Sequence, residues 1–117
     1  MSRTIREEIE KILREKVKAR GEGGKLIIAS TDGLPIASSL PEEQSQDTNE
    51  LSAYSMQIVN EVKKLLHEMG YSSPKFIQIK TEDGTHLNIY VRNDKIVIYI
   101  TRGRFFKVSK ISSYEPR

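Results

Sequence analysis

Apolar residues recur at helical spacing near the start of the chain. The segment TIREEIEKILREKVKAR predicts an amphipathic helix in which Thr4 and Glu7 form a capping box and Gly21 ends the helix in a GEGG connector. Charged residues fill the other sides of this helix. Its apolar positions are Ile5, Ile9, Ile12, Leu13 and Val17.

A second, longer segment has the same spacing. It predicts a central helix that begins near residues 47–49 and ends at Gly70, after a mobile loop at 41–49. The predicted core stripe comprises Leu51, Tyr54, Ile58, Val62, Leu65, Leu66 and Met69. Met56 and Val59 lie off this stripe, beside Asn60 and Lys63, so this helix is expected to make two separate contacts.

Five short segments are typical of strands: KLIIAS, LPIASSL, KFIQIKT, HLNIYVR and KIVIYITR. The stretch STDGLPIAS could belong to a catalytic loop or a phosphate-binding loop, but Asp32-Gly33 between two strands favours a hairpin with a tight primed turn. Pro35 cannot donate a backbone hydrogen bond, which predicts that the second strand lies at a sheet edge.

The last three strands form a meander with apolar residues on both faces, because isoleucines alternate with Phe76, Tyr90, Val97 and Tyr99. Two helices, one for each face, would cover such a sheet. The predicted fold class is therefore α+β in α/β/α layers, with a five-stranded antiparallel sheet and the order α-β-β-α-β-β-β.

The length of 117 residues predicts one domain over 1–117, with a core at 4–101 and a basic tail at 102–117. The chain has no cysteine, which excludes disulfides and thiol chemistry. No apolar run is long enough to cross a bilayer, so we expect a cytoplasmic protein that contacts membranes only indirectly.

The sequence offers little catalytic chemistry. His67 and His86 have no second metal ligand at chelating spacing, and no serine lies in a nucleophile elbow. TEDGTH has Thr81 where an aspartyl phosphatase needs a first carboxylate, and ARGEGGKL lacks phosphate-loop spacing. We expect no catalytic residue, no cofactor and no metal site.

The tail RGRFFKVSK mixes bases with two phenylalanines. Such a segment can bind single-stranded nucleic acid by stacking and charge, which is one alternative function. The favoured interpretation is that the Phe pair folds back on the sheet, because no RNA-recognition motif accompanies it.

The first meander strand, residues 76–81, is expected to be a free edge that pairs with a second copy of the chain. The predicted interface combines this strand with the second face of the central helix. Its residues are Met56, Val59, Asn60, Lys63, Phe76, Ile77, Gln78, Ile79 and Lys80.

The order of elements and the segments LIIASTDGLPIAS, NELSAYSMQIVNEVKKLLHEMG and FIQIKTEDGTHLNIYVRNDKIVIYIT resemble the roadblock / dynein light chain family, including its bacterial and archaeal members. The resemblance covers about residues 4–101. It implies a profilin-like roadblock fold and a homodimer joined through the first meander strand, with the central helices paired beside it.

The resemblance further implies that the dimer scaffolds or regulates a Ras-like small GTPase by selecting one switch conformation. Most family members end in a third helix, which the tail of this sequence does not resemble. Arg104 is the one candidate for an arginine supplied to the GTPase, and the alternative for this residue is a solvated tail. A structural subunit of a larger assembly is a further alternative.

Overall fold

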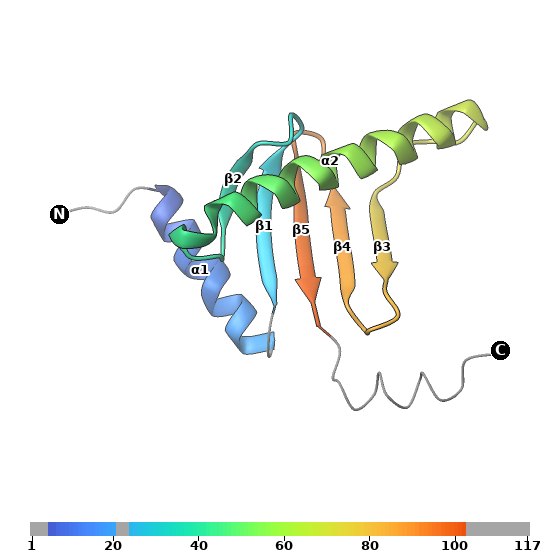
Figure 1. Ribbon diagram of the computed structural model, residues 1–117. Helices are drawn as coiled ribbons and strands as arrows, with labels where there is room; N and C mark the ends of the chain where they lie inside the picture. The colour runs from blue at the N-terminus through green and yellow to red at the C-terminus, as the bar shows by residue number, and fades with distance from the viewer. Residues whose placement is uncertain (1–4, 21–23, 103–117) are drawn as a thin grey trace.

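Two helices and a five-stranded antiparallel sheet make up the part of the chain that the structure, a computed structural model, describes: residues 5–20 and 24–102 (Figure 1). The predicted Thr4 cap, the Gly21 stop, Arg104 and the tail from residue 103 lie outside the described residues. The elements are α1 (Ile5–Arg20), β1 (Lys25–Ser30), β2 (Pro35–Ser38), a 3-10 turn (Glu42–Gln44), α2 (Ser45–Glu68), β3 (Phe76–Lys80), β4 (His86–Val91) and β5 (Lys95–Thr101). This is the predicted order.

The strands lie in the order β2-β1-β5-β4-β3, so β2 and β3 are the two edges, as the sequence predicted. The core lies between the sheet and α2. Its centre consists of Ile27, Ile89, Ile96 and Ile98, which alternation places on one sheet face and which are fully buried. Stiff β-branched side chains suit this position because they lose little rotamer freedom in a strand.

The predicted core face of α2 is wrong. Val59 is 0% exposed and Met56 is almost fully buried, both in the chain's own core, whereas Tyr54 is 58% exposed and Leu65 and Met69 are also exposed. The face that was expected to be a second contact therefore packs on the sheet. Most of the expected core stripe lies at its margin or in solvent.

Small polar residues explain this exchange of faces. Thr48, Ser52 and Ser55 lie on the buried face of α2, together with Met56 and Val59. The Ser52 hydroxyl donates to the Thr48 carbonyl at 2.8 Å, and Thr48 Oγ1 lies 3.3 Å from Ser38 Oγ on β2. Their hydrogen-bonding capacity is satisfied inside the protein, so burying them costs little, and their size lets the helix approach the sheet closely.

The ends of α2 differ from the prediction in one respect. The stretch 41–49 is helical from Glu42 onward rather than a loop. The helix ends where expected, because Gly70 has a φ of +85° and two reverse hydrogen bonds close the last turn. These run from the Tyr71 N–H to Leu66 O at 2.8 Å and from the Gly70 N–H to His67 O at 3.1 Å, which is the Schellman arrangement.

The hairpin at Asp32-Gly33 exists, but its turn is not primed. The Gly33 N–H donates to Ser30 O and the Ser30 N–H to Leu34 O, so the loop has three residues, and only Gly33 has a positive φ. With Asp32 and Gly33 as the central pair, a type I′ turn needs a positive φ at both residues and a type II′ turn needs one at Asp32, and Asp32 has none. The β3–β4 hairpin repeats this geometry, with Gly84 in the position of Gly33.

The two helices pack on opposite faces of the sheet, as predicted. α1 contacts β2 and β1, where Leu13 is buried, and it does not extend over β4 and β3. Ile12 on the same helix remains exposed. The predicted α/β/α arrangement, with one helix for each face of a five-stranded antiparallel sheet, is confirmed. Within the described residues, α1 lies over the β2 side of its face.

Replacing Met56 with Ala should lower the free energy of unfolding by about 2–4 kcal/mol, because the truncation leaves a cavity in the chain's own core. Urea unfolding at several protein concentrations measures this. A loss that is independent of concentration is expected. Gln57→Ala, at an exposed neighbouring position, is the control and should be nearly neutral.

Asp83 should titrate below its ordinary range. Its carboxylate accepts hydrogen bonds from the Thr81 hydroxyl and the Thr85 N–H, and these lower the pKa of Asp83. A lowered folded-state pKa stabilises the hairpin above the unfolded pKa of about 4, and this contribution disappears as the pH falls through the folded-state value. NMR titration of the carboxyl carbon measures it.

Thr81→Val should return the Asp83 pKa toward its ordinary value, because the largest cause of the shift is removed. Glu82→Gln, which changes a neighbouring charge in the same loop, is the control. An Asp83 pKa that is unchanged in Thr81→Val would contradict the assignment.

Candidate functional site

The strand β3 presents an unpaired backbone edge. It pairs only with β4, in the register Phe76 to Tyr90 through Lys80 to His86, and no other described strand lies beside it. The Val91 N–H donates to Lys75 O at 2.9 Å, and this bond shows which residues of β3 direct their backbone groups toward β4. Because antiparallel bonding alternates along a strand, the N–H and C=O groups of Phe76, Gln78 and Lys80 point away from β4.

The side chains of β3 divide between two environments. Ile77 is half-buried against the core, and Ile79 beside it is exposed on the α2 side of the sheet. Phe76 is exposed on the opposite face and its ring lies 4.8 Å from that of Tyr90. Gln78 Nε2 donates to Asn88 Oδ1 at 2.7 Å, so this part of the strand is held in register by its neighbour.

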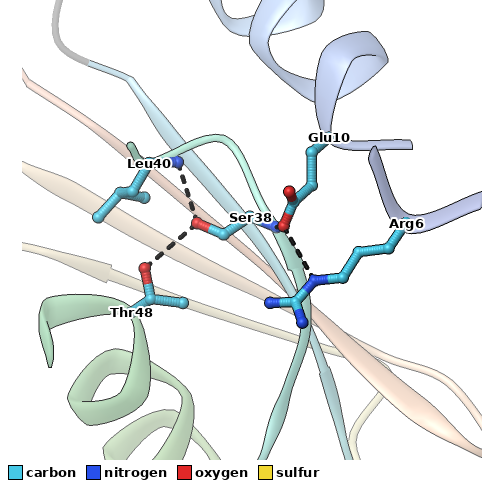
Figure 2. Close-up of polar contacts among 5 residues, drawn as sticks. All are labelled: Arg6, Glu10, Ser38, Leu40 and Thr48. Atoms are coloured by element: carbon cyan, nitrogen blue, oxygen red, sulfur yellow. Dashed lines mark hydrogen bonds and ion pairs between the residues drawn. The ribbon is translucent and has the colours of Figure 1, made fainter. Parts of the chain in front are cut away.

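The opposite edge of the sheet, β2, is closed by the chain itself. Pro35 has no N–H to offer, and the Ser38 N–H donates to Glu10 Oε2 of α1 at 3.2 Å (Figure 2). Arg6 Nε lies 3.3 Å from the same oxygen and holds the carboxylate in place. A sheet with one covered edge and one open edge can add a single partner strand only at β3.

The C-terminal half of α2 extends past the β3 edge of the sheet (Figure 1). The contacts of α2 as a whole with the sheet are mainly with β1, β2 and β5, the three strands farthest from β3 in the strand order. Exposed apolar side chains lie along α2 and in the stretch that follows it. They are Tyr54, Leu65, Met69 and Tyr71.

The structure brings together only some of the predicted interface. Phe76, Ile77, Gln78, Ile79 and Lys80 form the open edge. Asn60 is exposed but lies about 200° around the helix from Ile58, away from the apolar stripe. Lys63 is half-buried and lines a cleft with Lys75 and Arg92.

Met56 and Val59 are not available to a partner, because they lie in the core. The residues missed as interface candidates are Tyr54, Leu65 and Met69. Their spacing was visible in the sequence, but it was assigned to the core because all three are large and apolar.

The residues considered for chemistry are scattered. His67 Nε2 lies 3.0 Å from Ser73 Oγ after α2, whereas His86 begins β4 on the sheet. Asp32 is exposed in the first hairpin turn. Over residues 5–20 and 24–102, no group of three or more His, Cys, Asp or Glu side chains is placed to hold a metal, and no helix is both long and apolar enough to span a bilayer.

Comparison with known proteins gives a structural likeness without a sequence match. No family model matches the chain, and no curated protein sequence matches it. Several solved structures, however, are similar to it. MglB of Myxococcus xanthus superposes with a TM-score of 0.68 at 16% identity, covering 97% of this chain and 88% of that chain.

Two further solved structures agree. The gliding protein MglB of Thermus thermophilus gives a TM-score of 0.66 at 10% identity, covering 97% of this chain and 87% of that chain. A Roadblock/LC7 domain of Streptomyces avermitilis gives 0.66 at 11% identity, covering 87% and 90%. With the element order and strand order described above, these similarities show that the chain has the roadblock/LC7 fold.

Proposed function

We propose that this chain is a single-domain, non-enzymatic, cytoplasmic homodimer that binds a Ras-like small GTPase, as a scaffold or as a regulator of its nucleotide state. The observation that carries the proposal is the open edge of β3 beside the overhanging apolar end of α2. The fold likeness to MglB and to a Roadblock/LC7 domain supports it, as does the sequence resemblance to the roadblock family. One of the similar structures is described as MglB with tetrameric arrangement, so self-association occurs in that protein.

The geometry of β3 supports one register for the proposed dimer. A two-fold axis at Gln78 pairs this residue with its own copy, Phe76 with Lys80 of the partner subunit, and Ile77 with Ile79 of the partner subunit. In this register every outward-pointing backbone group of β3 meets an outward-pointing group of the other copy, as antiparallel pairing requires. It is also the register in which all five residues of the strand overlap.

The side-chain pairs of this register are favourable. The two isoleucine pairs lie on the α2 side and extend the core across the axis, whereas the Phe76 ring faces the aliphatic stem and ammonium group of a lysine. The overhanging half of α2 then lies over the partner subunit. Burial of its exposed Leu65 and Met69 supplies the apolar area that strand pairing alone lacks.

Such a dimer regulates a GTPase only through a difference in affinity. A partner that binds one switch conformation more tightly shifts the GTPase toward it, and a tenfold preference corresponds to about 1.4 kcal/mol. This mechanism needs no catalytic group on the dimer.

Ile79→Lys should convert the dimer to a monomer, because it places an ammonium group opposite Ile77 of the partner subunit without disturbing a fully buried position. Leu65→Lys should weaken the dimer in the same way. Light scattering across a range of protein concentrations measures the mass. The matched control is Ile36→Lys, which changes an exposed isoleucine on the closed β2 edge and should remain dimeric.

The outcome that would contradict the interface is a dimer that survives both Ile79→Lys and Leu65→Lys, or a wild-type chain that is monomeric at high concentration. Circular dichroism of each variant establishes that it remains folded.

The GTPase assignment is tested with Ras-like GTPases of the source organism, each loaded with GDP or with a non-hydrolysable GTP analogue. Calorimetry should give an affinity for one GTPase that differs at least about tenfold between the two states. Equal affinity in both states would leave only the scaffold role. Absence of binding to all of them would overturn the assignment while leaving the dimer intact.

A further inference from the structure

A basic cleft lies between α2 and the two connections at the nearby ends of β3 and β4. It has a volume of about 590 Å³, and its walls come from α2, from the stretch between α2 and β3, and from the β4–β5 turn. Its cations are Lys63, Lys75 and Arg92, and Ser73 and Asn93 add neutral polar groups. None of the residues that line it is a carboxylate.

Lys63 has no carboxylate at the helix positions where ion pairs form. The residues three and four positions away from it are Val59, Asn60, Leu66 and His67. The next residue, Lys64, has Glu61 and Glu68 at those distances. Lys63 is also half-buried, and within the described part of the chain neither Lys63 nor Lys75 forms an ion pair. A half-buried ammonium group without a counter-charge favours an anion from outside the chain.

Hydrogen bonds hold two walls of the basic cleft in place. The Val91 N–H donates to Lys75 O at 2.9 Å, which joins the start of β3 to the end of β4. Ser73 Oγ lies 3.0 Å from His67 Nε2, which ties the stretch after α2 back to the helix. The backbone of the cleft is therefore formed before a ligand arrives, and binding costs mainly the ordering of the lysine side chains.

The charges next to the cleft do not cancel its own. The Asp94 carboxylate, which follows Asn93 in the β4–β5 turn, lies 3.3 Å from Lys95 Nζ and is already paired. The Arg92 guanidinium is positioned by the Tyr90 ring, whose centre lies 5.8 Å away. A cleft lined by charges of one sign concentrates ions of the opposite sign. The occupant should therefore be an anion.

We propose that the basic cleft binds a small soluble anion that carries two or more phosphate groups. Ammonium groups bind phosphate oxygens by charge-assisted hydrogen bonds, and the Ser73 hydroxyl and Asn93 amide supply neutral donors beside Lys63 and Lys75. The volume lies within the range of about 300–1,000 Å³ that is usual for small-molecule sites, so there is room for more than one phosphate group. All the lining residues belong to one chain, so this binding is separate from the proposed dimer and GTPase roles.

The test adds inorganic pyrophosphate to the full chain at constant ionic strength and follows the backbone amides by NMR. Saturable shifts should be largest at Ser73, Lys75 and Asn93. Lys63→Gln should weaken binding at least about tenfold, because a charge-assisted hydrogen bond is lost. The matched control is Lys64→Gln, which makes the same change of charge one residue further along α2, at a position that does not line the cleft, and should bind as the wild type does.

Equal weakening in Lys63→Gln and Lys64→Gln would overturn the proposal, because the anion would then respond only to the overall charge of the protein. Equal shifts with sodium chloride alone at the same ionic strength would also overturn it. A second arm measures sedimentation with vesicles of phosphatidylcholine and phosphatidylglycerol. Vesicle binding that depends on Lys63, without binding of pyrophosphate, would assign the cleft to a membrane surface instead of a soluble ligand. The NMR spectrum of each variant establishes that it is folded.

Discussion

Backbone groups at the edge of a sheet need partners, and the two edges of this sheet meet that need differently. At β2 the chain supplies its own partner, because Glu10 reaches from α1 to the Ser38 N–H and Arg6 holds the carboxylate there. At β3 nothing described in the chain does so. Among the described strands, this asymmetry leaves only β3 open to edge-to-edge pairing. A two-fold pair of strands each with one open edge has no open edge left, whereas sheets with two open edges could add strands without limit.

The position of α2 is the second determinant of the surface. Its N-terminal half lies close to the sheet because Thr48, Ser52 and Ser55 are small and hydrogen-bonded where they are buried. The same placement directs the C-terminal half past β3. Large apolar side chains on that half, Leu65 among them, are exposed as a consequence of how the other half packs.

Much of the fold was accessible from local patterns. Both helices, all five strands and the edge position of β2 were predicted, since alternation, helical spacing and a proline are local features. Turn geometry was less accessible. Asp-Gly is compatible with a primed two-residue loop and with the three-residue loop that occurs, and the choice depends on how the flanking strands pair at Ser30 and Leu34.

The candidate site, like the fold, was predictable from the sequence only in part. The sequence by itself determined that residues 76–80 form an apolar strand without proline, and that α2 has more apolar surface than one contact needs. Only the tertiary structure decided which face of α2 is buried, because serines and threonines become core residues when a facing group such as Ser38 accepts or donates their hydrogen bonds. Likewise, only the tertiary structure shows that α1 covers the β2 edge while β3 has one neighbour among the described strands. The Glu10–Ser38 hydrogen bond at the β2 edge joins residues that are 28 positions apart, and no local sequence pattern relates them.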